Sequence, residues 1–285
     1  MIAIIATTFF AAVVNGALGY GFSSLAVPLA LLVVSNRVLN PAIVLLEVVL
    51  NAHVLWNNRA ALTHVWKRVL GVMVGLLPGV ALGTSVLTHV DPSWLKLAIF
   101  TGLLPLILLQ TAGYRRRVRA ERIAGVVLGG AVGTIYAVTT ISGPPLAMFL
   151  TNQGYANTDF RVALGAIRLV ASVLTAALYA RSSLYSRESL SLLIAILPAV
   201  ILGVPAGAWL IRRTQEETFR RLCMSFDAVI VAFGVSTLLH ALHIVDGTAA
   251  YLPCAAVVAF DVIVLVRFFR TPLEGPSPHS GLAAP

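Results

Sequence analysis

The chain has 285 residues, of which 59% are hydrophobic and only 11% are charged, and its mean hydropathy is +0.92. Soluble domains carry about 25% charged residues, so this composition excludes a water-soluble globular protein. The net charge of +9 lies almost entirely in short loops between apolar runs, which is typical of positive-inside membrane topology and argues against nucleic-acid binding. We therefore predict an all-α, polytopic protein embedded in a lipid bilayer.

Nine apolar segments, each long enough to cross a ~30 Å hydrocarbon core, follow one another along the chain. The first lacks the basic n-region of a cleavable signal peptide and is taken as part of the mature protein. The Pro/Gly/Ser-rich tail, residues 271–285, is predicted to be disordered. The predicted segments are 2–34, 40–58, 69–88, 93–112, 122–151, 158–180, 189–211, 218–243 and 249–269.

A short motif recurs at corresponding places in the two halves of the chain. "LPGVALG" (77–83) lies 120 residues before "LPAVILG" (197–203), and each follows a shorter span that follows a long, interrupted one. We predict two copies of a four-segment unit, residues 1–112 and 122–243, with an extra helix at 249–269.

Glycines repeat at a spacing of four residues around both copies of this motif. That spacing puts them on one helix face, which predicts a close helix-packing surface. They are Gly71, Gly75, Gly79 and Gly83 in the first copy and Gly203 and Gly207 in the second.

The first segment of each copy is too long for one straight span and is interrupted. A helix over 122–151 would be about 45 Å long, and residues 2–34 form a longer run still. The interruptions are "GYGFSS" (19–24) and "SGPP" (142–145), where glycine loosens the backbone and proline removes a donor. Either each segment is one tilted, kinked helix, or it is a re-entrant hairpin of two half-helices.

The distribution of basic residues separates these alternatives for 122–151. If all nine segments cross, the 19 Lys and Arg residues other than Arg168 divide ten to nine between the two sides. If 122–151 leaves by the face it entered, they divide fifteen to four, the bias expected in a bacterial inner membrane. We predict a re-entrant segment there and, by repeat similarity, at 2–34. Each copy then crosses three times, so the copies are inverted.

The two interruptions are predicted to bind an anion. A half-helix that ends inside the membrane leaves backbone N–H groups without partners at the positive end of its dipole. The predicted substrate-binding residues here are Gly21, Ser23 and Ser24 in the first copy and Ser142, Gly143 and Pro144 in the second. The alternative is an ordinary kink repaired by neighbouring helices.

Two ionisable residues, Glu47 and Arg168, lie near the centres of apolar segments, 121 residues apart. Charges at this depth are costly and mark a pathway or a pair. Arg168, with its permanent charge and planar donors, suits an oxyanion, whereas Glu47 could pair with it or carry a coupling proton. Asn51 and Ser172 follow one turn later on the same faces. The alternative is a structural ion pair that orders the bundle.

Other polar residues give weaker signals. Asp227 and Asp261 also fall within apolar segments. No metal-ligand spacing and no nucleotide-binding motif occurs, so we expect no metal, no cofactor and no ATP-driven step.

Two stretches resemble the TauE/SafE-type sulfite and organosulfonate exporters, also called the TSUP family of permeases. They are "SGPPLAMFLTNQGYANTDFRVAL" (142–164) and "GALGYGFSSLAVPL" (16–29), within a resemblance that covers about residues 5–243. Many members have a fuller glycine run where this chain has Phe22-Ser23-Ser24 and Ile141-Ser142-Gly143. The resemblance implies a two-repeat permease for small sulfur-containing anions such as sulfite or sulfonates.

Together these observations predict a secondary transporter, not an enzyme, that moves a small anion by alternating access with possible proton coupling. The predicted location is a bacterial inner membrane. A membrane-embedded enzyme or assembly factor that uses the same cavity, or an anion channel, is the alternative.

Overall fold

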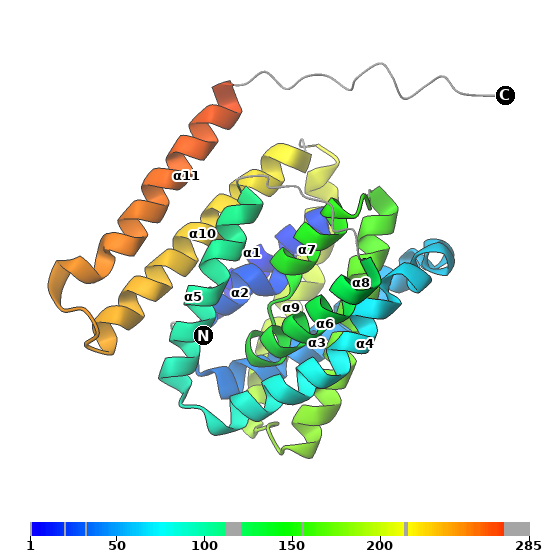
Figure 1. The fold of residues 1–285 in the computed structure, drawn as a ribbon, viewed down its shortest axis with the longest axis horizontal. Helices are drawn as coiled ribbons and strands as arrows, with labels where there is room; N and C mark the ends of the chain where they lie inside the picture. Colours follow the sequence, from blue (N-terminus) through cyan, green and yellow to red (C-terminus); the bar gives the residue numbers. More distant parts are fainter. Residues whose placement is uncertain are drawn as a thin grey trace.

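The computed structural model describes residues 2–19, 21–31, 33–111, 121–155, 157–213 and 216–270, and these residues form helices joined by short turns (Figure 1). The helices are α1 (Ile2–Leu18), α2 (Phe22–Leu31), α3 (Asn36–Asn57), α4 (Arg59–His89), α5 (Pro92–Thr111), α6 (Glu121–Thr139), α7 (Gly143–Asn152), α8 (Asn157–Arg181), α9 (Arg187–Ile211), α10 (Glu216–Ala241), the 3₁₀ turn η1 (Gly247–Tyr251) and α11 (Leu252–Arg270).

The described helices confirm the all-α, polytopic architecture. Among the described residues, five stretches are long and apolar enough to cross a membrane: Asn36–Trp56, Arg59–His89, Thr158–Arg181, Arg187–Ile211 and Gly247–Arg267. Both long segments are interrupted where predicted, between α1 and α2 and between α6 and α7. The largest difference in a boundary is at the start of α4, which begins at Arg59 and not near residue 69. The helix continues through Lys67 and Arg68 because both basic side chains are exposed.

Helices α3 and α8, which hold corresponding places in the two copies, run in opposite directions against each other. Gly165, early in α8, packs against Val54, late in α3. Further along α8, Arg168 meets Glu47, which lies earlier in α3. A helix that is antiparallel to its own counterpart is the arrangement of inverted repeats.

The interrupted helices pack on the opposite copy through glycines. A Cβ atom on Gly79 would collide with the Gly130 carbonyl of α6, and one on Gly207 would collide with the Val13 carbonyl of α1. Helix α6 therefore lies directly on α4, and α1 lies directly on α9. Both pairs are parallel, and the predicted glycine packing surface is confirmed.

The pair α6 and α7 begins and ends beside the same end of α4. Near the start of α6, Gly125 packs on Val72 of α4. Just after α7, the Gln153 carbonyl accepts a hydrogen bond from Arg68 Nη2 at 3.4 Å, and the Arg68 guanidinium lies 4.0 Å from the centre of the Tyr155 ring. The segment therefore returns to the side it came from, as the charge distribution predicted.

Helices α5, α10 and α11 form the side of the molecule away from α3, α4 and α8 (Figure 1). Helix α10 packs on α5 and also carries α11, the extra helix. The repeat limits 1–112 and 122–243 stay predictions. The basic loop 112–120 and the tail 271–285, which was predicted to be disordered, lie outside the described residues.

Candidate functional site

The second break, between α6 and α7, is held by side chains from both copies. The Asn40 amide of α3 donates to the Val138 carbonyl at 2.5 Å. The Tyr179 hydroxyl of α8 donates to the Ala137 carbonyl. Within the break, the Ile141 N–H donates to Thr139 Oγ1 at 2.8 Å, and Thr140 has a φ of 58°. The last carbonyls of α6, which have no helical partner, are therefore capped by the neighbouring helices.

The start of α7 offers a small set of donors. Gly143 is its first residue, and the next two positions are Pro144 and Pro145, which have no N–H. Of the first three residues of α7, Gly143 is therefore the one that carries a backbone N–H. The Ser142 hydroxyl is buried and has no hydrogen-bond partner within the described part of the chain. This hydroxyl is the second donor that the tip can offer to a ligand.

A buried ion pair lies next to this break. Arg168 Nη2 is 2.5 Å from Glu47 Oε1, and the Tyr136 hydroxyl donates to Glu47 Oε2 at 2.7 Å. All three side chains are buried. Tyr136 lies one helical turn before the end of α6, so it ties the ion pair to the second break. Removing one member of such a pair leaves an uncompensated charge, which makes the pair strongly interdependent.

Hydrogen-bond donors without a partner among the described residues lie on α3 and α8, the helices that carry this ion pair. Arg168 Nε, the Asn51 amide nitrogen and Thr175 Oγ1 are buried without a partner among the described residues. The Ser172 hydroxyl, in contrast, donates to the Leu169 carbonyl at 3.0 Å. Buried donors are nearly always satisfied in native proteins, so each open one is a candidate contact for a ligand or a water.

The first break, between α1 and α2, is built from glycine. Gly19 and Gly21 have φ values of 79° and 94°, which side chains rarely adopt. The Ser24 hydroxyl donates to the Gly21 carbonyl at 3.1 Å. The backbone N–H groups of Phe22, Ser23 and Ser24 form the first turn of α2 and have no intrahelical acceptor.

Arg161, in the first turns of α8, lies against this break. Its Cγ is 3.4 Å from the place that a Cβ on Gly19 would occupy. Arg161 lies 121 residues after Asn40, the same offset that separates Glu47 and Arg168. Each break is therefore contacted by a residue of the opposite copy. The Asn40 amide contacts the second break, and the Arg161 side chain, at the equivalent position, contacts the first.

Only some of the predicted site residues contact one another in the structure. Glu47 and Arg168 are in contact, and Tyr136 links them to the second break. No hydrogen bond or ion pair between described residues connects Arg168 with Gly21, Ser23 or Ser24. The binding roles of the predicted residues stay predictions.

Sequence reasoning missed Tyr136, Asn40 and Arg161. Arg161 enters only the count of basic residues on the two sides of the membrane, and Tyr136 lies within the apolar run 122–151. The offset of 121 could have identified Asn40 and Arg161, because it already related Glu47 to Arg168.

Two other acidic residues, Asp227 and Asp261, lie within apolar segments of the sequence. Asp261 is buried on α11, with Oδ1 unpartnered among the described residues. The side chain of Asp227 lies outside the described residues. Within the described ranges, no group of three or more His, Cys, Asp or Glu side chains could hold a metal ion.

Comparison with known proteins identifies the family. The profile described as "Sulfite exporter TauE/SafE" matches residues 4–236, which is 233 of the 285 residues. Comparisons with curated proteins and with solved structures gave no match. The family is one of membrane transporters for sulfite and related sulfur compounds. Because the match spans most of both predicted copies, this chain belongs to the sulfite exporter TauE/SafE family.

Proposed function

We propose that the chain is a secondary transporter that moves sulfite or a small organosulfonate by alternating access. The observation that carries this proposal is the buried Arg168 guanidinium, whose Nε has no partner among the described residues, beside a membrane helix that stops and turns back. A guanidinium inside a membrane protein is expensive and marks a substrate pathway by default. Its planar donors match the oxygens of a sulfur oxyanion.

The other open groups nearby suit the same ligand. The Ser142 hydroxyl, the Gly143 N–H and the Asn51 amide nitrogen are donors, as an oxyanion requires. The positive end of the α7 dipole adds to the attraction. In this proposal Arg168 supplies the countercharge, and Ser142 and Gly143 bind anion oxygens. Pro144 lies in the first turn of the half-helix, where its missing N–H costs no hydrogen bond.

The inverted copies provide a route for alternating access. Transporters of this design move one repeat against the other around a central site. Gly21, Ser23 and Ser24 at the first break are the counterparts of the second tip, and three N–H groups in the first turn of α2 have no intrahelical acceptor. We propose that they contact the anion in the state that faces the opposite side of the membrane.

Glu47 is proposed to couple transport to protons. Its carboxylate holds Arg168 and accepts a hydrogen bond from Tyr136. Protonation of Glu47 would remove the charge that competes with the anion for Arg168. Anion binding and proton binding would then favour each other. The fifteen-to-four distribution of basic residues supports a bacterial inner membrane as the location.

The test is flux of radiolabelled sulfite into proteoliposomes that contain the full chain. The wild type should show saturable flux, inhibited by sulfonates more than by carboxylates of the same size. Arg168→Gln should abolish flux. Because that variant leaves Glu47 unpaired, the double variant Glu47→Gln/Arg168→Gln serves as a folded reference and should also be inactive.

Two controls make the result specific. Ser236→Ala removes a buried hydroxyl of α10 that, like Ser142, has no partner in the described part of the chain, and it should leave flux unchanged. Glu47→Gln alone should keep flux but lose its dependence on a pH gradient. Sulfite flux that persists in the double variant would remove Arg168 from the site, and flux that never saturates would favour a channel.

A further inference from the structure

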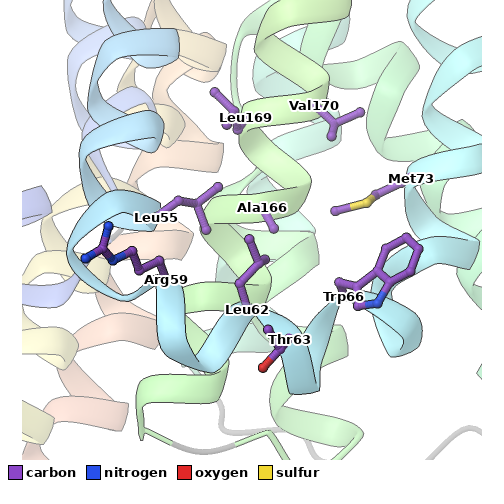
Figure 2. Close-up of a pocket in the computed structure, with 9 residues that line it drawn as sticks. All are labelled: Leu55, Arg59, Leu62, Thr63, Trp66, Met73, Ala166, Leu169 and Val170. Carbon is purple, nitrogen blue, oxygen red and sulfur yellow. The ribbon is translucent and has the colours of Figure 1, made fainter.

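An apolar pocket lies on the outer side of the helix that carries Arg168. It has a volume of about 500 Å³ and lies between the end of α3, the first half of α4 and α8 (Figure 2). Leu169 and Val170 of α8 form its floor, and Leu55 of α3 and Met73 of α4 line its sides. Cavities of this size hold small ligands in other proteins. Its apolar walls do not suit a sulfur oxyanion.

One tryptophan lines the pocket, and a second lies beside its Arg59. Trp66 lines the pocket and is 45% exposed, and Trp56, on the last turn of α3, is 70% exposed. Tryptophan is enriched at membrane–water interfaces, where its amphipathic ring is stabilised. The pocket therefore reaches from headgroup depth into the acyl region.

The rim is positively charged. Arg59 lies at the edge of the pocket, and its guanidinium points away from the apolar walls and lies 5.4 Å from the centre of the Trp56 ring (Figure 2). Lys67, which does not line the pocket, is exposed two turns later on the same helix, and α4 contains no Asp or Glu from Arg59 to His89. This rim complements a negatively charged headgroup.

We infer that this pocket binds one anionic glycerophospholipid. An acyl chain lies on Leu169 and Val170, and the phosphate lies at Arg59. An anionic lipid fits better than a neutral one because the rim is basic, and basic pockets between membrane helices bind such headgroups. The bound chain supports α8 from outside, opposite the face on which Arg168 meets Glu47.

The inference can be tested on the purified full chain in detergent, with phosphatidylglycerol and phosphatidylcholine as the probes. Lipid binding is measured by native mass spectrometry and by the shift in melting temperature that each lipid produces. The wild type should retain one phosphatidylglycerol in preference to phosphatidylcholine. Arg59→Gln should weaken phosphatidylglycerol binding about fivefold, the effect of one interfacial basic residue. Phosphatidylcholine binding should change little.

Two further variants separate the pocket from general interfacial charge. Val170→Phe fills the pocket and should reduce the binding of both lipids while sulfite flux shows that the protein folds. Arg213→Gln is the matched control, because Arg213 also lies over a tryptophan, 4.3 Å from the centre of the Trp209 ring, but does not line this pocket. It should leave lipid binding unchanged.

Three results would overturn the inference. The first is equal affinity of the wild type for the two lipids, and the second is an equal effect of Arg59→Gln and Arg213→Gln. The third is a lipid-free dimer that Val170→Phe dissociates, which would assign the pocket to a second copy of the chain.

Discussion

The two helix breaks lie at corresponding places in the two repeats but are held in different ways. The second break is fixed from outside, by Asn40 and Tyr179, and is tied to the buried ion pair through Tyr136. The first break relies on glycine backbone conformations at Gly19 and Gly21 and on a packed arginine side chain.

This difference suits the alternating access that we propose, which needs one part of the site to bind the anion and another part to move. The second break is preorganised, because neighbouring helices cap its carbonyls and the adjacent donors stay open for a ligand. The first turn of α2 contains no proline, so it has more N–H groups without an intrahelical acceptor than the first turn of α7, and glycine leaves the backbone of the first break free to rearrange. We expect the second break to define what binds and the first to move between states.

The largest expected effect comes from the ion pair beside the second break. Arg168→Gln alone should lower the free energy of unfolding by about 3–5 kcal/mol, because it leaves Glu47 charged and unpaired. Glu47→Gln/Arg168→Gln should recover much of this loss. Thermal unfolding in detergent, analysed as a double-mutant cycle, measures the coupling. Additive effects of the two substitutions would show that the pair is not coupled.

The equivalent positions Asn40 and Arg161 test whether the breaks are held differently. Asn40→Ala should destabilise the protein by about 1–3 kcal/mol, because it leaves the buried Val138 carbonyl without its donor. Arg161→Gln should change stability by less than about 1 kcal/mol but reduce sulfite flux, since we place it at the moving break. Melting temperatures and initial flux rates of both variants decide this. Equal destabilisation by the two substitutions would contradict the hypothesis that the two breaks are held differently.

Backbone conformation sharpens the comparison further. Gly19→Ala should cost about 1–2 kcal/mol, because its φ of 79° is unfavourable for a residue with a Cβ. Thr140→Gly at the second break should change stability by less, because relief of the strained φ of 58° offsets the greater entropy of the unfolded glycine. Chemical denaturation of both variants gives the difference. A larger loss for Thr140→Gly would mean that its side chain, not its backbone, holds the break.

The smallest effect on stability is expected at Ser142. Its hydroxyl has no partner among the described residues, so Ser142→Ala should change the free energy of unfolding by less than about 0.5 kcal/mol. It should nevertheless raise the KM for sulfite several-fold, because an anion contact is lost. Flux titrations of Ser142→Ala beside Ser236→Ala provide the comparison. An unchanged KM would remove Ser142 from the binding site.

Much of this architecture could be predicted because lipid imposes simple rules. Apolar runs of membrane length located the spans, and the bias of Lys and Arg predicted that 122–151 turns back. The interruptions were visible because Gly19, Gly21 and the Pro144-Pro145 pair stand out in apolar surroundings. The start of α4 was misplaced because Lys67 and Arg68 resemble loop charges, although a helix can extend past the membrane with charged side chains exposed.

By itself, the sequence determined the membrane environment, the two-copy organisation and the candidate charges, since these follow from composition, spacing and length. Only the tertiary structure decided which partners those charges have. Tyr136 reaches Glu47 from 89 residues away, and Asn40 caps a carbonyl 98 residues away. Such contacts depend on how helices from the two copies cross, and no local pattern encodes a crossing. The glycines made close packing predictable, but the choice of α6 for α4 and of α1 for α9 arises from the inverted arrangement of the whole bundle.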